Sequence, residues 1–192
     1  MGFLETHLVL GIVLLGVFSD VSKPWPVINS DKKEFILTPH SEFNITCSGE
    51  SRVRWAEPLP DNSEMHSGFN HSTLVITDVE ALNTRLYTCE YVDQPERNAE
   101  IYVFVSDPEV PFVSEPVVET NEMGITIPCL ATNPHSQVIL RDLQSGDVVS
   151  LFYDHKTGFF GILSPGQYVC ETSVNGKAVR SSVYNVTNDT GN

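Results

Sequence analysis

An all-β fold of two tandem β-sandwiches is predicted from two features that the 192-residue sequence repeats. The first is cysteine spacing: 42 residues separate Cys47 from Cys89, and 41 separate Cys129 from Cys170. The second is a tyrosine that stands two residues before the later cysteine of each pair. Four cysteines allow three pairings, and the repeated spacing predicts one bridge in each unit.

The first unit, expected over residues 20–106, carries the features of an immunoglobulin domain. Apolar and polar residues alternate from Phe43 to Cys47, which predicts a half-buried strand whose cysteine points inward. Trp55 follows, and Tyr87 matches the tyrosine corner of these domains, in which the hydroxyl ties a turn to its strand. Further strands are expected at residues 53–55, 74–76 and 101–105. This order of cysteine, tryptophan and Tyr-x-Cys predicts an immunoglobulin-like β-sandwich.

The second unit, expected over residues 107–192, repeats the pattern with two differences. Tyr168 supplies a second tyrosine corner, but there is no tryptophan, so we expect Leu140 to fill the corresponding core position. Pro128 lies beside Cys129 within the expected strand, and because proline lacks an N–H it predicts a bulge or an edge there.

The connection between the two units is short. Residues 105–108 lead from the last strand of the first unit directly into Pro108, without a Gly/Ser-rich spacer. Because such a linker is stiff, the two sandwiches are expected to meet at a restricted angle.

The charge of the chain narrows the possible partners. It holds 25 acidic and 11 basic residues, for a formal net charge of −14. Such a surface repels phosphate backbones, which disfavours nucleic-acid binding, and it attracts basic partners over long range. The acidity can also serve only to keep a secreted protein in solution.

The N-terminus has the features of a signal peptide, expected over residues 1–19. Residues 8–18 form an apolar run broken only by glycines, which is too short to cross a bilayer. Paired cysteines agree with an oxidising, extracellular compartment. No later segment approaches about 18 apolar residues in a row, so we expect a secreted chain without a membrane span.

The sequence contains no motif of an enzyme or a metal site. The kinase signatures G-x-G-x-x-G, H-R-D and D-F-G are absent, as are G-x-S-x-G and H-E-x-x-H. The cysteines are too far apart for C-x-x-C ligation. We therefore expect no catalytic residues, no cofactor and no metal.

Several segments resemble the first two extracellular domains of the platelet-derived growth factor receptors, the alpha type more than the beta type. Residues 101–108 are similar to the family's junction between these domains, residues 125–129 to a second-domain strand, and residues 153–161 to a distinctive loop. Shorter similarities lie at residues 47–51 and 174–177. The resemblance extends over essentially the whole chain after the expected signal peptide.

This resemblance implies a piece of a class III receptor tyrosine kinase ectodomain, either a truncated receptor or a soluble decoy, that binds a basic, dimeric platelet-derived growth factor. In that family the second and third domains hold the growth factor. The second domain uses an early strand and its closing strand, here expected at residues 183–186. The implied ligand-binding residues are Val117, Val118, Tyr184 and Val186.

Two alternatives remain open at this point. Each of these four side chains can instead be ordinary inner-face core. The chain can also be an adhesion or recognition module of the immunoglobulin superfamily, because the fold alone does not separate these functions. The family-like segment at residues 153–161 favours the receptor.

Four Asn-x-Ser/Thr triplets predict N-glycosylation, at Asn44, Asn70, Asn185 and Asn188. Asn44 is out of phase with the apolar residues of its strand, so its side chain is expected to face solvent.

Overall fold

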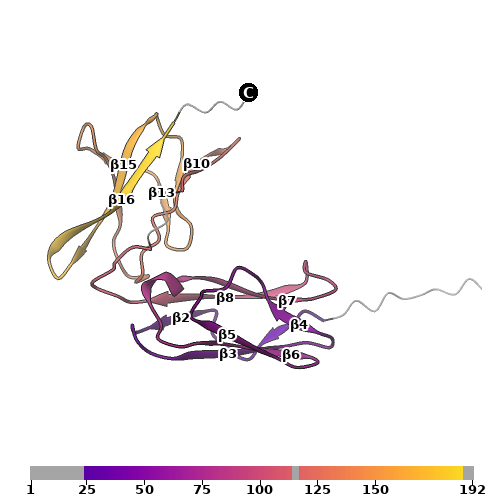
Figure 1. Cartoon of the computed structure of the whole chain (residues 1–192). Coiled ribbons are helices and arrows are strands. Elements are labelled where there is room, and N and C mark those ends of the chain that lie inside the picture. The colour runs from indigo at the N-terminus through magenta and orange to yellow at the C-terminus, as the bar shows by residue number, and fades with distance from the viewer. Residues whose placement is uncertain (1–23, 114–116, 188–192) are drawn as a thin grey trace, which may run out of the picture.

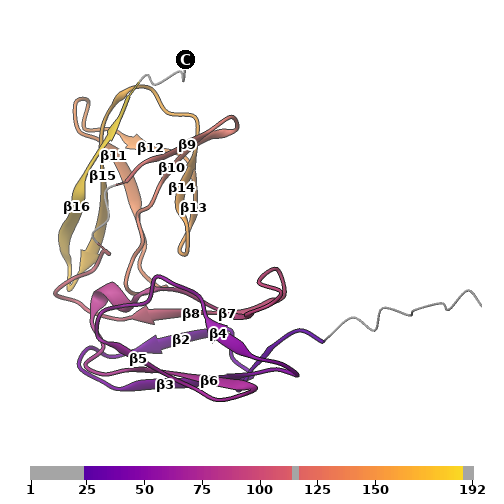
Figure 2. The same ribbon diagram turned by 45° about the vertical axis from the view of Figure 1, so that its right-hand side comes forward.

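Two β-sandwiches, stacked one on the other, make up the computed structural model of this chain (Figures 1 and 2). The structure describes residues 24–113 and 117–187. Nearly all regular structure in this part is β-strand, so the predicted fold class is confirmed. The expected signal peptide, residues 1–19, and Asn188 lie outside the described residues. The domain bounds at residues 20, 106 and 107 stay predictions.

The first sandwich contains eight strands and one turn of 3-10 helix. These are β1 (Val27–Ile28), β2 (Glu34–Leu37), β3 (Phe43–Ser48), β4 (Val53–Trp55), β5 (Ser63–Ser67), β6 (His71–Ile76), η1 (Ala81–Asn83), β7 (Arg85–Tyr91) and β8 (Asn98–Val105). They form two sheets with the strand orders β1-β3-β6-β5 and β2-β8-β7-β4. Strands β2 and β8 pair in parallel, and the other pairs are antiparallel.

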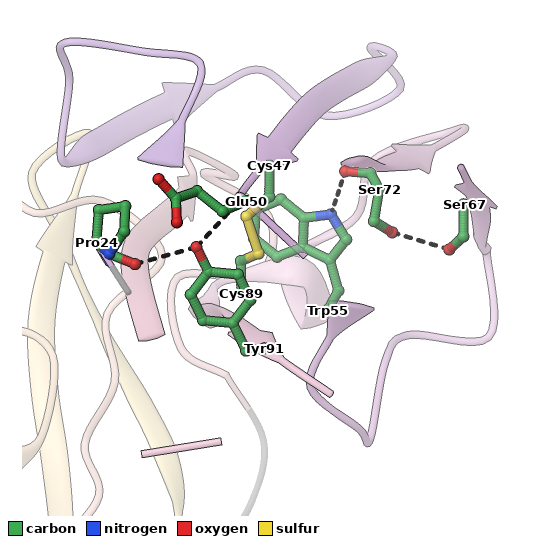
Figure 3. The surroundings of a disulfide bond; sticks show 8 residues. All are labelled: Pro24, Cys47, Glu50, Trp55, Ser67, Ser72, Cys89 and Tyr91. Atoms are coloured by element: carbon green, nitrogen blue, oxygen red, sulfur yellow. Dashed lines mark hydrogen bonds between the residues drawn. A yellow bond between two sulfur atoms is a disulfide. The ribbon is translucent and has the colours of Figure 1, made fainter. Parts of the chain in front are cut away.

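The core of the first sandwich is built around a disulfide and a tryptophan. Cys47 on β3 is bonded to Cys89 on β7, so the bridge joins the two sheets. Trp55 is fully buried in the same core cluster, and its indole Nε1 donates a hydrogen bond to the carbonyl of Ser72, 3.1 Å away (Figure 3). Because the only polar atom of the indole is satisfied, the ring can be buried without a desolvation cost.

A tyrosine corner is present in both sandwiches, as predicted. The hydroxyl of Tyr87 donates to the carbonyl of Asn83 at 3.1 Å, and that of Tyr168 donates to the carbonyl of Ser164 at 2.8 Å. Asn83 stands where these domains commonly have aspartate. It still closes the turn, because its Oδ1 accepts the backbone N–H of Glu80 at 2.7 Å.

The second sandwich also contains eight strands. These are β9 (Glu119–Asn121), β10 (Gly124–Ile127), β11 (Ile139–Asp142), β12 (Val148–Val149), β13 (Phe152–Asp154), β14 (Gly158–Gly161), β15 (Gly166–Val174) and β16 (Lys177–Val186). The sheets have the orders β13-β14-β10-β9 and β12-β11-β15-β16, and Cys129 is bonded to Cys170 between them.

Leu140 is fully buried in the second core, in contact with the cluster around the bridge, so its predicted role is confirmed. The strand was expected to run through Pro128 with a bulge or an edge there; this expectation is wrong, because strand β10 ends one residue earlier, at Ile127. Proline has no N–H for the ladder. The chain turns instead, with the N–H of Cys129 donating to the carbonyl of Ile127 at 2.8 Å.

Strand β8 is buried on both faces, and its outer face joins the two sandwiches. Ile101, Val103 and Val105 point into the first core, whereas Tyr102 and Phe104 point outward and are nevertheless buried. The sheet that contains β8 faces the second sandwich, and the hairpin between β13 and β14 reaches down to it (Figure 2).

The tip of the β13–β14 hairpin supplies aromatic and charged contacts at this joint. The ring of His155 lies 5.4 Å from that of Phe104, and the Nζ of Lys156 lies 5.6 Å from the ring centroid of Tyr102. Lys156 also forms an ion pair with Glu34 at 2.6 Å. Burial of a phenylalanine contributes about 1.5–3 kcal/mol, but a partly exposed ion pair contributes about 0–1 kcal/mol. The aromatic residues therefore stabilise the joint more than the charges do.

The ion pair at the joint depends on pH in a defined direction. The hydrogen bond from Lys156 lowers the pKa of the Glu34 carboxyl below its ordinary value. A carboxyl whose pKa is lowered by folding adds stability above its unfolded pKa and loses it as the pH falls through the folded value. The pair is therefore intact at neutral pH and is lost only in acid.

The buried position of Leu140 predicts a large stability effect. Leu140→Ala should lower the free energy of unfolding of the second sandwich by about 2–5 kcal/mol, because it leaves a cavity beside the disulfide. Calorimetric unfolding measures this change. Leu82→Ala, at an exposed position, is the control and should change stability by less than about 0.5 kcal/mol. Equal effects of the two substitutions would contradict this account of the core.

The joint can be tested at Phe104. Phe104→Ala removes the ring on which His155 packs, so amide hydrogen exchange in residues 152–161 should become faster, while the cores keep their protection. The matched control is Phe69→Ala, because Phe69 is 83% exposed in the first sandwich. Unchanged exchange in the hairpin of the Phe104 variant would show that the ring does not hold the joint.

Candidate functional site: the outer faces of the second sandwich

Two of the four predicted ligand-binding residues lie in the core of the second sandwich. Tyr184 is 1% exposed and donates a hydrogen bond from its hydroxyl to the carbonyl of Pro128 at 3.1 Å, and Val186 is 5% exposed. Burial raises the pKa of the Tyr184 hydroxyl. In this structure neither side chain is accessible to a partner, so both match the alternative of inner-face core.

The phase of strand β16 explains this placement. Side chains on a strand alternate between its two faces, so Val183 and Asn185 point outward when Tyr184 and Val186 point inward. In the sequence, the polar Asn185, itself a predicted glycan acceptor, indicates that its neighbours Tyr184 and Val186 point inward. Val183 is the apolar residue that the closing strand shows to solvent.

Val117 and Val118 precede the first strand of the second sandwich. The strand was expected to include both residues, but β9 begins at Glu119, so that expectation is corrected. Val118 packs against the core, whereas Val117 is 65% exposed. Of the four residues, Val117 is thus the one whose side chain a partner can reach, and a ligand-binding role for the set stays a prediction.

The outer face of the sheet β12-β11-β15-β16 carries an ion network that the sequence did not predict. Glu171 accepts hydrogen bonds from Arg141 Nη2 at 3.1 Å and from Arg180 Nε at 3.0 Å. The hydrogen bond from Arg141, together with that from Arg180, lowers the pKa of Glu171. These residues come from three strands, so only the strand register brings them together.

The outer face of the sheet β13-β14-β10-β9 carries exposed aromatic residues. Phe152 on β13 is paired in register with Phe160 on β14, and Phe160 is paired with Thr126 on β10. Phe152 is 71% exposed and Phe160 is 37% exposed, whereas the neighbouring Phe159 is buried in the core. The resemblance of residues 153–161 to a family loop does not tell the inward phenylalanine from the outward one; the strand register does.

The glycan acceptors within the described residues lie at the surface. Asn44, Asn70 and Asn185 are exposed, and Asn44 is out of phase with the buried residues of β3 as predicted. The side chain of Asn185 accepts a hydrogen bond from Gln167 at 2.9 Å.

In the part of the chain that the structure describes, no three His, Cys, Asp or Glu side chains gather in a way that could hold a metal ion. No helix there has the length and hydrophobicity to cross a membrane. What the described surface offers is sheet faces with exposed apolar and charged side chains, an arrangement suited to contact with another protein.

Comparison with known proteins agrees with this architecture. A family model described as the VEGFR1-3 N-terminal Ig-like domain matches residues 24–115. The chain is 34% identical to platelet-derived growth factor receptor alpha of Xenopus laevis, over 96% of this chain and 19% of the receptor. It is 34% identical to the human alpha receptor, over 93% of this chain and 18% of the receptor. It is 31% identical to the human beta receptor, over 83% of this chain and 16% of that receptor.

The chain thus spans less than a fifth of the length of these relatives. The similarity covers both sandwiches, with their two disulfides and their tyrosine corners. The chain is therefore similar, over both of its immunoglobulin-like domains, to the platelet-derived growth factor receptors.

Proposed function

We propose that this chain is an extracellular segment that binds a basic, dimeric platelet-derived growth factor. The observation that carries the proposal is the similarity to platelet-derived growth factor receptors over 96% of the chain. We further propose that the segment, which itself contains none of the kinase motifs, is part of a truncated receptor or a soluble decoy.

The electrostatics of the chain support a basic partner. With 25 acidic and 11 basic residues, the segment attracts a positively charged protein over long range. This attraction speeds the encounter more than it strengthens the final complex, and it weakens as salt is added.

The two disulfides and the contacts of β8 support a role as a rigid ligand-binding unit. A segment that presents its surfaces in a fixed arrangement loses less conformational entropy on binding than one joined by a flexible linker. The same features suit an immunoglobulin adhesion module, so the binding experiment has to separate the two functions.

We predict that this chain alone binds a platelet-derived growth factor weakly. In the resembled family the third domain supplies part of the contact with the growth factor. Loss of about half the binding free energy of a nanomolar complex leaves roughly −6 to −8 kcal/mol. This corresponds to a Kd between tens of micromolar and about one micromolar. Surface plasmon resonance of the purified chain at physiological salt measures this. A chain extended by a third domain is the reference and should bind with nanomolar affinity.

Two outcomes would change this view. Nanomolar binding by the short chain would show that the third domain is not needed. The absence of binding by both proteins would favour the adhesion module.

We also predict that the secreted protein carries N-glycans. Expression in a secretory host should give a protein whose intact mass falls on treatment with a glycosidase. Asn44→Gln, Asn70→Gln and Asn185→Gln should each remove one glycan, because these side chains are exposed. An unglycosylated product retained in the cytosol would contradict both the glycosylation and the secretion.

A further inference from the structure

Strand β5 forms an open edge of the first sandwich. The sheet order is β1-β3-β6-β5, and within residues 24–113 and 117–187 β5 pairs with β6 alone. The second sandwich stands on the other sheet, and β5 lies in the layer farther from it (Figure 2). Four of the five residues of β5, from Glu64 to Ser67, are exposed. The strand therefore presents its outer edge to solvent.

This edge lacks the features that commonly keep edge strands apart. An open edge can pair with another strand, and proteins prevent this with lysine, proline, a bulge or a very short strand. β5 contains no lysine, arginine or proline, and its five pairs with β6 follow one another without a shift in register. The longer edge strand β16, in contrast, carries Lys177 and Arg180. The other edge strands have two to four residues each.

The hydrogen bonds of the β5–β6 hairpin decide which backbone groups face the open edge. The N–H of Gly68 donates to the carbonyl of His71 at 2.8 Å, so these two residues form a hydrogen-bonded pair. Bonded and non-bonded pairs alternate along an antiparallel ladder. His66 therefore bonds to β6, whereas Met65 and Ser67 direct their backbone N–H and C=O groups to the open edge.

A second copy of the chain fits this edge in an antiparallel arrangement centred on Met65. Around such a twofold axis Met65 lies opposite its counterpart, and Ser63 lies opposite Ser67, so the outward backbone groups of the two copies meet. The N–H of Ser63 already donates to the carbonyl of Pro60 at 3.0 Å, so only the carbonyl of Ser63 takes part. The pairing joins the two four-stranded sheets into one continuous sheet.

The side-chain charges favour the same register. In it, Glu64 of each copy lies opposite His66 of the other, in the type of pair that brings side chains closest. Both side chains are exposed, and within one chain His66 Nε2 lies 3.6 Å from Glu64 Oε2. Opposite charges across two strands stabilise the pairing, and like charges destabilise it. A register shifted by two residues would place Glu64 opposite Glu64, or His66 opposite His66.

We propose that β5 is a self-association edge, through which two copies of this chain pair as an antiparallel, twofold-symmetric dimer. This goes beyond the proposed function, and the pairing needs no growth factor. A five-residue strand forms a small interface, and interfaces that bury less than about 1,200 Å² belong to weak, transient complexes. We therefore expect the dimer to form at about 0.1–1 mM rather than at nanomolar concentration.

Sedimentation equilibrium of the secreted chain, with and without its N-glycans, measures this association. Both forms are needed because Asn70, a predicted glycan acceptor, lies between β5 and β6 and next to the open edge. A dimer in either form is the expected result. A monomer in both forms up to about 1 mM would overturn the proposal.

A proline substitution tests whether the backbone of β5 makes the contact. Met65→Pro removes the outward N–H at the centre of the dimer and leaves the bonds to β6, so it should weaken dimerisation by about tenfold or more. Met65→Thr is the matched control, because it changes the side chain but keeps the N–H, and it should weaken dimerisation by less than about fivefold. Circular dichroism checks that both variants fold. Equal dimerisation of the proline variant and the unaltered chain would show that the copies pair elsewhere.

Two charge variants test the register without a proline. Glu64→Lys brings a lysine opposite His66, and His66→Glu brings two carboxylates together, so each should weaken self-association. In a mixture of the two variants, the introduced lysine lies opposite the introduced glutamate, and a heterodimer should form. If the unaltered chain dimerises but the mixture does not associate more strongly than either variant alone, the proposed pairing is wrong.

Discussion

The burial of strand β8 on both faces is the constraint on which the rest of the structure depends. Its inward residues, Ile101, Val103 and Val105, complete the first core, and its outward residues, Tyr102 and Phe104, hold the second sandwich. A strand that packs on both sides cannot shift its register without exposing one of these sets to water. The folding of the first sandwich and the placement of the second are therefore coupled through one eight-residue strand.

This coupling determines which surfaces the molecule offers. Because the second sandwich stands on the sheet β2-β8-β7-β4, the outward side chains Tyr102 and Phe104 of that sheet are covered, and further outward faces lie on the second sandwich (Figure 1). There the two outer faces differ in chemistry. On one of them Arg141 and Arg180 neutralise Glu171. The other bears exposed aromatic rings beside carboxylates, and an acidic, apolar surface of this kind favours a basic partner over another acidic protein.

The sequence predicted most of the architecture because its strongest signals are local or are repeated. The cysteine spacing, the tyrosine before each second cysteine and the alternation before Cys47 each depend on few residues, and the structure has all three. Leu140 could be assigned to the core for the same reason. The expectation at Pro128 was wrong because a proline can either distort a strand or end it, and only the neighbouring hydrogen bonds decide which.

By itself, then, the sequence determined two disulfide-bridged immunoglobulin-like sandwiches, an acidic surface and the similarity to a receptor family. The tertiary structure decided which side chains reach that surface. Tyr184 and Val186 became core residues because the phase of β16 turns them inward, and Phe160 became a surface residue because the register of β14 turns it away from Phe159. Tyr102 and Phe104 became part of a joint because the β13–β14 hairpin, far from them in the sequence, covers them. Contacts between residues so distant in sequence follow from strand pairing and packing, which local patterns do not specify.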